Sequence, residues 1–192
     1  MRIVVSGTHA SGKSTLISDF ASRHPEYEVL GDPFEELADE GYVDLDAALF
    51  RAQLEIAALR LEEAAEGSNV IAERGPMDFV AYLEALDRLE RRGRSSASSR
   101  AGLARAEAVA DRIDLWVLLP LDDGDPIAVG EDEDPELRAA MNDALLDLAD
   151  EAGLAGAVVI ELTGDPKARL VMLERAVAPS PRSESQSESA GI

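Results

Sequence analysis

The sequence predicts an α/β domain in which helices cover both faces of a five-stranded parallel sheet. Short apolar runs rich in β-branched residues alternate along the chain with longer segments of helical periodicity, which is the pattern of repeated β–α units. Right-handed crossovers between parallel strands then place the helices on both faces of the sheet. The chain has 192 residues, of which 46% are hydrophobic, so it can build one domain, or at most two, around a buried core.

Five segments are expected to be strands, because each is short and apolar. They are residues 3–5, 27–30, 69–72, 115–119 and 158–162. Seven segments between or beside them have helical periodicity, with Gly or Pro near most of their ends. They are residues 13–23, 34–40, 46–66, 77–91, 101–110, 135–152 and 166–177.

Three segments depart from this alternation. Residues 91–100 combine Ser, Gly and Arg, and we expect a mobile loop that joins two helices. Residues 121–137 carry eight carboxylates with no Lys or Arg, and the breakers Pro126 and Pro135 predict a second loop. Residues 179–192 have too little apolar content to fold, so we expect a domain over 1–178 and a disordered tail.

Composition excludes several classes of function. The 39 acidic residues against 18 Lys and Arg give a formal net charge of −21, and such a surface repels nucleic acid. The chain has no cysteine, so disulfides, thiolate zinc sites, iron–sulfur clusters and cysteine nucleophiles are excluded. With only His9 and His24, a histidine-rich metal site is not expected either.

No segment predicts secretion or membrane insertion. The apolar run at the N-terminus is too short for a signal peptide, and no later run approaches the ~20 apolar residues of a spanning helix. We therefore expect a cytoplasmic protein without a membrane partner.

The strongest motif is the segment from Gly7 to Thr15, which reads Gly-Thr-His-Ala-Ser-Gly-Lys-Ser-Thr and matches the P-loop pattern. A β-branched run ends just before it and an amphipathic segment follows it, as a strand–loop–helix unit requires. Glycines let the backbone wrap so that amide groups point at phosphate oxygens. Lys13 is expected to reach the outer phosphates of ATP and Ser14 to ligate Mg²⁺. The expected nucleotide-binding residues are Gly7, Ala10, Ser11, Gly12, Lys13, Ser14 and Thr15, whereas His9 is expected to fill an unconstrained position.

A P-loop indicates a nucleotide but not a reaction. Switch GTPases read guanine with an Asn-Lys-x-Asp element, and neither Lys13 nor Lys167, the only lysines, stands in one. Mechanical ATPases need a helical lid domain or a dimerisation signature, for which this chain has neither room nor sequence. A small phosphotransferase fits better.

Three further elements are informative. Gly31-Asp32-Pro33-Phe34 follows the second predicted strand, Phe50-Arg51-Ala52-Gln53 precedes Arg60 by seven residues, and Glu73-Arg74-Gly75 ends the third predicted strand. With the P-loop, they make residues 1–177 resemble the branch of P-loop proteins that contains deoxyribonucleoside kinases and nucleoside-monophosphate-kinase-like proteins, with related small AAA-type ATP-binding kinases. The resemblance implies the P-loop NTPase fold, with strand order 2-3-1-4-5, and a homodimer as one assembly.

Physical chemistry assigns roles to the strand-end residues. Ligands of open α/β sheets bind beyond the carboxyl ends of the strands, where Gly7, Asp32 and Glu73 should converge. Phosphoryl transfer needs a metal ion, cations and a carboxylate that orients the attacking hydroxyl. Asp32 is the candidate for that carboxylate, Glu73 for holding the Mg²⁺ shell directly or through water, and Arg74 for steadying the phosphoryl group. An Asp-Pro turn and a salt bridge between Glu73 and Arg74 are the structural alternatives.

Two further pairs of roles follow from the resemblance. Gln53 and Arg60 lie on one helix face and correspond to residues that recognise the acceptor base, although a solvated helix face explains them equally well. Asp165, with Arg169 after it, resembles the loop that covers the adenine ring. Asp165 is also a good N-cap before Pro166, and both roles can hold together.

One region departs from the resemblance. Kinases of this branch carry an arginine-rich lid after the fourth strand, whereas this chain is acidic there and its first later cation is Arg138. Three alternatives remain: Arg138 alone serves as the lid cation, the arginines of 91–100 replace it, or the protein is a weak kinase.

The sequence therefore supports two hypotheses. The first is ATP- and Mg²⁺-dependent phosphotransfer to a hydroxyl of a small metabolite, with a nucleoside or nucleoside-like acceptor. The second is a nucleotide-binding regulatory protein with slow turnover, which the acidic segment favours.

Overall fold

The computed structural model describes residues 1–37, 46–91, 95–121, 134–151 and 157–178. Its centre is a parallel sheet of five strands in the order β2-β3-β1-β4-β5, so the predicted fold class and strand order are confirmed. The strands are β1 (Arg2–Ser6), β2 (Glu28–Leu30), β3 (Val70–Glu73), β4 (Leu115–Leu118) and β5 (Val158–Glu161).

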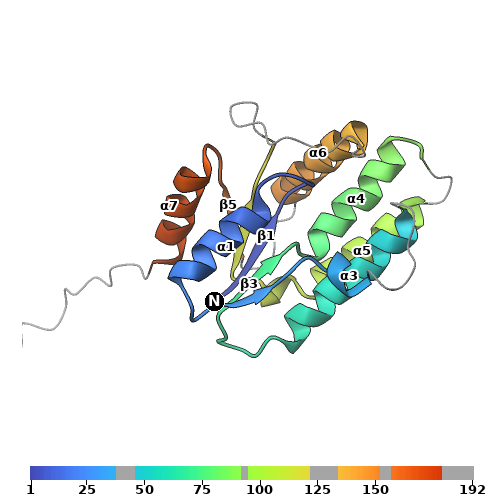
Figure 1. Ribbon diagram of the computed structural model, residues 1–192. Helices are drawn as coiled ribbons and strands as arrows, with labels where there is room; N and C mark the ends of the chain where they lie inside the picture. The colour runs from blue at the N-terminus through green and yellow to red at the C-terminus, as the bar shows by residue number, and fades with distance from the viewer. Residues whose placement is uncertain (38–45, 92–94, 122–133, 152–156, 179–192) are drawn as a thin grey trace, which may run out of the picture.

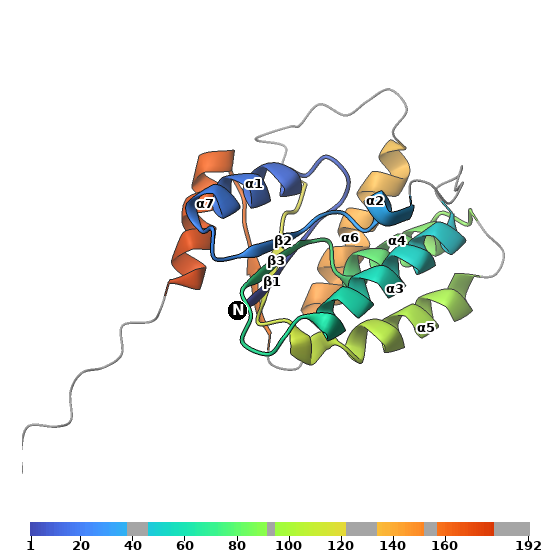
Figure 2. The same ribbon diagram turned by 60° about the horizontal axis from the view of Figure 1, so that its bottom comes forward.

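Helices cover both faces of the sheet (Figure 1). Two helices, α1 (Lys13–Arg23) and α7 (Pro166–Val177), lie together on one face, and the opposite face carries the larger helical layer. Figure 2 shows this larger layer to the right of the sheet, with α1 and α7 to its left. Its members are α3 (Ala47–Glu63), α4 (Pro76–Arg88), α5 (Ser95–Glu107) and α6 (Pro135–Glu151), and the short elements are α2 (Phe34–Leu37) and a 3-10 helix (Ala110–Arg112).

Alternation along the central strands builds two cores. Ile3 and Val5 of β1 pack with α1 and α7, whereas Val4 packs into the cluster formed with α3, α4 and α6. In β4, Trp116 lies in the same cluster as Val4, and Val117 lies in the cluster that contains Ile3 and Val5. Because β1 is buried on both faces, it reads as a continuous apolar run, as central strands of parallel sheets do.

The loop predicted over 91–100 is wrong from Ser95 onward, where α5 begins. Ser is a moderate helix former, and tertiary packing decides the outcome here. A Cβ on Gly102 would lie 3.1 Å from Leu54 of α3 and 3.3 Å from Leu83 of α4, so this glycine lets α5 approach both helices closely. The buried Ser99 hydroxyl also donates to Asp87 of α4 at 2.9 Å.

Other predicted boundaries shift by a few residues. The helix predicted over 46–66 runs from Ala47 to Glu63, with Asp46 as its N-cap. The loop predicted over 121–137 is wrong from Pro135 onward, where α6 begins, because Pro is favoured in the first turn of a helix. Most of that segment (122–133), the end of the helix predicted over 34–40, and the predicted tail (179–192) lie outside the described residues. No helix in the described part of the chain has the length and apolar character needed to cross a membrane.

Candidate active site

The P-loop joins β1 to α1 and wraps tightly for steric reasons. A Cβ on Gly7 would lie 2.6 Å from the Ser11 hydroxyl and 2.8 Å from the Leu119 carbonyl, so no larger residue fits. Gly12 has a φ of 90° and is the N-cap of α1, a backbone conformation that glycine adopts readily. The loop therefore has the strand–turn–helix geometry that can hold a phosphate group at a helix N-terminus.

Lys13 begins α1 and turns back over the loop. Its side chain is buried, and its ammonium group donates to the Thr8 carbonyl at 2.9 Å. Burial and, secondarily, the positive charge of Arg74 lower the pKa of Lys13 to about 7, although three nearby carboxylates act in the opposite direction. In the free protein the loop thus holds a lysine that is only partly charged near neutral pH.

Ser14 and Glu73 meet across the P-loop. The Ser14 hydroxyl donates to the Glu73 carboxylate at 2.9 Å, so the two predicted metal-binding residues lie side by side although 59 positions separate them. A hydroxyl and a carboxylate at the edge of a phosphate loop are oxygen donors of the kind that Mg²⁺ prefers. These residues therefore fit a magnesium ion.

Asp78, in the first turn of α4, has no role in the sequence analysis but organises the base of the P-loop. Its carboxylate is fully buried and accepts hydrogen bonds from the amides of Gly7 (3.0 Å) and Gly75 (2.9 Å) and from the Ser6 hydroxyl. Ser6 in turn accepts a bond from the Trp116 indole at 2.7 Å. The sequence signal was an acid three residues after a glycine at a helix start, the N3 position from which a carboxylate accepts the N-cap amide.

We expect Asp78→Ala to lower the free energy of unfolding by about 3 kcal/mol, because it leaves two buried amides and a hydroxyl without their acceptor. Urea unfolding would measure the loss. The matched control is Asp150→Ala, at an exposed position of α6, which should change stability by no more than about 0.5 kcal/mol. Equal stability of the two variants would show that Asp78 does not support the loop.

Arg74, which is buried, and Asp32, which is partly exposed, form an ion pair at the ends of β3 and β2. The Arg74 Nε lies 2.7 Å from Asp32 Oδ2, and another Arg74 nitrogen donates to the Gly7 carbonyl at 3.0 Å. Asp32 also accepts the Phe34 amide at 3.0 Å, so it makes the Asp-Pro turn given as the structural alternative and is also linked to the P-loop through Arg74. Burial alone would raise the pKa of Asp32, but the Arg74 charge and these hydrogen bonds lower it, so the carboxylate is ionised at neutral pH.

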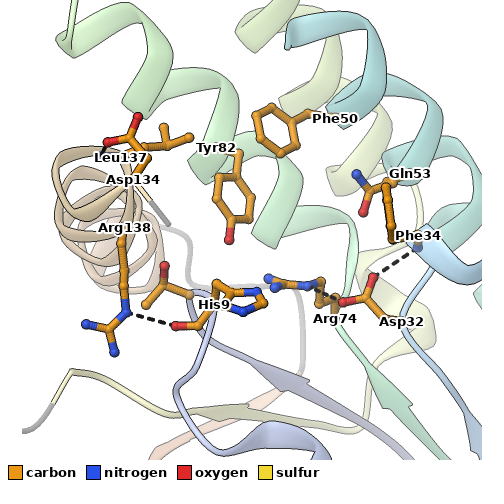
Figure 3. Close-up of a pocket in the computed structure, with 11 residues that line it drawn as sticks. His9, Asp32, Phe34, Phe50, Gln53, Arg74, Tyr82, Asp134, Leu137 and Arg138 are labelled. Carbon is orange, nitrogen blue, oxygen red and sulfur yellow. Dashed lines mark hydrogen bonds and ion pairs between the residues drawn. The ribbon is translucent and has the colours of Figure 1, made fainter. Parts of the chain in front are cut away.

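A cavity of about 300 Å³ opens beside the P-loop (Figure 3). Asp32 and Arg74 border it on one side, and the Tyr82 hydroxyl points towards the loop between His9 and Arg74. The rings of Phe50 and Tyr82 stack with centroids 4.5 Å apart, so part of the wall is flat and aromatic. The lining residues are Thr8, His9, Asp32, Phe34, Phe50, Gln53, Arg74, Tyr82, Asp134, Leu137 and Arg138.

The two residues expected to recognise the acceptor are separated by the structure. Gln53 is almost fully buried and lines the cavity, and within the described part of the chain its amide has no hydrogen-bond partner. Arg60 instead binds Glu36 at 2.6 Å and the Gly31 carbonyl at 2.6 Å, so it braces the turn after β2 and does not line the cavity. Gln53 is buried and Arg60 is partly buried, so the alternative that both lie on a solvated helix face is wrong.

The structure describes some of the candidate lid cations, whereas Arg92 and Arg94 lie outside the described residues. Arg138 of α6 lies over the P-loop, where it donates to the carbonyls of His9 (3.0 Å) and Ala10 (3.2 Å). Arg91, from the arginine-rich segment, is paired with Asp134 and Glu136 at the start of α6. Of these two, only Arg138 borders the cavity.

The remaining predicted nucleotide residues lie around the loop. Asp165 caps α7 by accepting the Ala168 amide at 2.8 Å, and Arg169 in the first turn of α7 donates to the Ser11 carbonyl of the P-loop. Thr15 is exposed in the first turn of α1. The N-cap role predicted for Asp165 is thus confirmed, and the adenine contact stays a prediction.

The pKa of Lys13 predicts a pH dependence of ATP binding. In the free protein Lys13 loses its proton above about pH 7, whereas bound phosphates favour the charged form. Binding at higher pH therefore takes up a proton, and the affinity for ATP without magnesium should fall, by up to about tenfold per pH unit between pH 8 and 9. Titration calorimetry in buffers of different ionisation enthalpy would measure the number of protons taken up when ATP binds. A Lys13→Arg variant should lack this slope, and equal slopes would contradict the assignment.

Comparison with known proteins agrees with this geometry. Residues 2–169 match the AAA domain family, so the chain belongs to that family. No curated protein matches the sequence.

Solved structures share the fold at low sequence identity. Deoxyadenosine kinase from M. mycoides with bound dATP has a TM-score of 0.68 at 17% identity, covering 92% of this chain and 98% of that one. Thymidylate kinase from Candida albicans has a TM-score of 0.65 at 15% identity, covering 92% and 90%. The protein therefore has the fold of P-loop nucleoside and nucleotide kinases.

Proposed function

We propose that the protein transfers the γ-phosphoryl group of ATP to a hydroxyl of a small metabolite, with a nucleoside or nucleoside-like compound as acceptor. The observation that carries the proposal is the position of the cavity. It extends from the P-loop residues Thr8 and His9 to Asp32, the carboxylate predicted to face the acceptor. A triphosphate on the loop and a hydroxyl beside Asp32 would thus meet in one space.

Five polar residues at the P-loop and the strand ends have roles in this reaction. Lys13 and the loop amides bind the phosphates, and Ser14 with Glu73 would hold Mg²⁺, which neutralises phosphate charge. The acceptor oxygen forms a bond to the γ-phosphorus as the bond to the β-phosphate oxygen breaks, and ADP leaves. Asp32 orients the acceptor hydroxyl and receives its proton, while Arg74, 2.7 Å from Asp32, steadies the transferring group.

The charges around the cavity favour an acceptor without a phosphate group. Of the two arginines that line it, Arg138 is engaged by the carbonyls of His9 and Ala10, and Arg74, held by Asp32 and the Gly7 carbonyl, is assigned to the transferring phosphoryl group. Asp32 and Asp134 add negative charge to the lining. An acceptor phosphate would have to displace these bonds, so we infer an uncharged acceptor.

The shape and remaining polarity of the cavity favour a planar group. Phe34, Phe50 and Tyr82 present aromatic surface, and stacking on such rings stabilises flat heterocycles. The Gln53 amide lacks a partner in the described part of the chain and can donate and accept at once. A nucleobase meets both conditions, and its ribose would supply the hydroxyl.

The test is a screen of ATP consumption with nucleosides, aminoglycosides, nicotinamide-like compounds and sugars as acceptors. We expect at least one nucleoside-like compound to raise the rate and its 5′-monophosphate to be a much weaker acceptor. A better monophosphate substrate would contradict the inferred uncharged acceptor. If no acceptor raises consumption, the regulatory hypothesis takes precedence.

A further inference from the structure

A buried arginine contacts the P-loop from the side of α7. Arg169 lies in the first turn of that helix, which Asp165 caps, and its side chain is only 3% exposed. One of its terminal nitrogens donates to the Ser11 carbonyl at 2.9 Å. It does not line the cavity beside Asp32.

Among the described residues, no carboxylate lies within ion-pair distance of the Arg169 guanidinium. Within the described ranges the Ser11 carbonyl is its one hydrogen-bond partner, its Nε is buried without a partner, and no carboxylate pairs with it. The Ser11 hydroxyl is likewise buried without a partner there. Arg74, the other arginine buried at this loop, is by contrast paired with Asp32.

A buried charge without a counter-charge costs free energy, and an anion bound nearby removes part of that cost. This chain carries a net charge of −21, so a polyanion needs locally positive surroundings to bind at all. The guanidinium of Arg169 provides positive charge next to the Ser11 carbonyl, in a loop whose geometry fits a phosphate group.

The backbone carbonyls of the P-loop also indicate that basic side chains support this loop. Five consecutive carbonyls of the P-loop each accept a hydrogen bond from a basic side chain. These side chains belong to α1, α6, α7 and the residue that follows β3. The pairs are Gly7 with Arg74 (3.0 Å), Thr8 with Lys13 (2.9 Å), His9 and Ala10 with Arg138 (3.0 and 3.2 Å), and Ser11 with Arg169 (2.9 Å).

We propose that Arg169 is a positioning residue for the triphosphate. Its guanidinium holds the Ser11 carbonyl so that the amides of the loop remain free for the phosphates, and its uncompensated charge stabilises the bound polyanion. This inference rests on the proposed function for its ligand, a polyphosphate. It assigns α7 to the phosphate site, in addition to the adenine contact that the resemblance implies for the loop before it.

The test compares Arg169→Met with Arg175→Met, an exposed arginine of the same helix. Calorimetry with inorganic tripolyphosphate and with Mg-ATP should show at least about a tenfold loss of affinity for Arg169→Met and no change for the control. The ligand-free melting temperature of Arg169→Met should stay within about 2 °C of wild type, because a lost hydrogen bond is offset by a removed unpaired charge.

A purely structural role would lower the melting temperature and leave the affinity of the folded variant unchanged, which would overturn the proposal. At pH 6, where a buried lysine keeps its charge, Arg169→Lys should bind tripolyphosphate within about threefold of wild type. Binding as weak as that of Arg169→Met would also overturn it. Failure of the proposed function is distinguishable, since the wild type would then bind triphosphate but phosphorylate no acceptor.

Discussion

Replacement of Lys13 by alanine is expected to abolish phosphoryl transfer and to weaken ATP binding by about 10- to 100-fold. The substitution removes the cation aimed at the outer phosphates, and a charge-assisted hydrogen bond of this kind contributes about 1.5–3 kcal/mol. It also removes the bond that Lys13 makes to the Thr8 carbonyl, 2.9 Å away in the free protein. Calorimetry with Mg-ATP and a coupled assay for ADP would measure both effects.

The chain supplies a matched control for this experiment. Lys167, the other lysine of the sequence, is exposed in α7, so Lys167→Ala makes the same chemical change away from the loop. We expect this variant to bind ATP as the wild type does. Unchanged ATP affinity of Lys13→Ala would refute the P-loop assignment.

Replacement of Asp32 by asparagine is expected to lower acceptor phosphorylation by about 10²–10⁴-fold, the range of general base contributions, while ATP binding persists. Asparagine keeps the size and much of the hydrogen bonding of Asp32, but it cannot receive the acceptor proton. It also removes the nearer counter-charge of the buried Arg74 guanidinium, 2.7 Å away, and leaves Asp78 at 3.8 Å as the other. The triphosphate is bound by other residues, so its affinity should change little.

The measurement needs a saturating acceptor from the screen, so that a lost binding contact is not taken for lost chemistry. Asp147→Asn is the matched control, because it removes an exposed ion pair with Arg88 (2.9 Å) outside the cavity. A wild-type rate for Asp32→Asn with saturating acceptor would show that Asp32 is not the base.

Elements with a local signal could be predicted from the amino-acid sequence. The P-loop pattern, the five apolar runs and the right-handed crossover rule predicted the parallel sheet, and the structure confirmed each strand within one or two residues. Parallel strands end at one edge of a sheet, so the approach of Gly7, Asp32 and Glu73 could also be foreseen.

The contacts between side chains could not be predicted and depend on how the elements pack. Ion pairs form between elements far apart in sequence, so the spacing of residues could not show that Arg74 binds Asp32 rather than Glu73, or that Arg60 turns to Glu36. The same holds for Arg169, whose contact with the P-loop spans 158 positions. Helix α5 forms over a segment that reads as a loop, because packing against α3 and α4 contributes more free energy than the weak local preference of its serines.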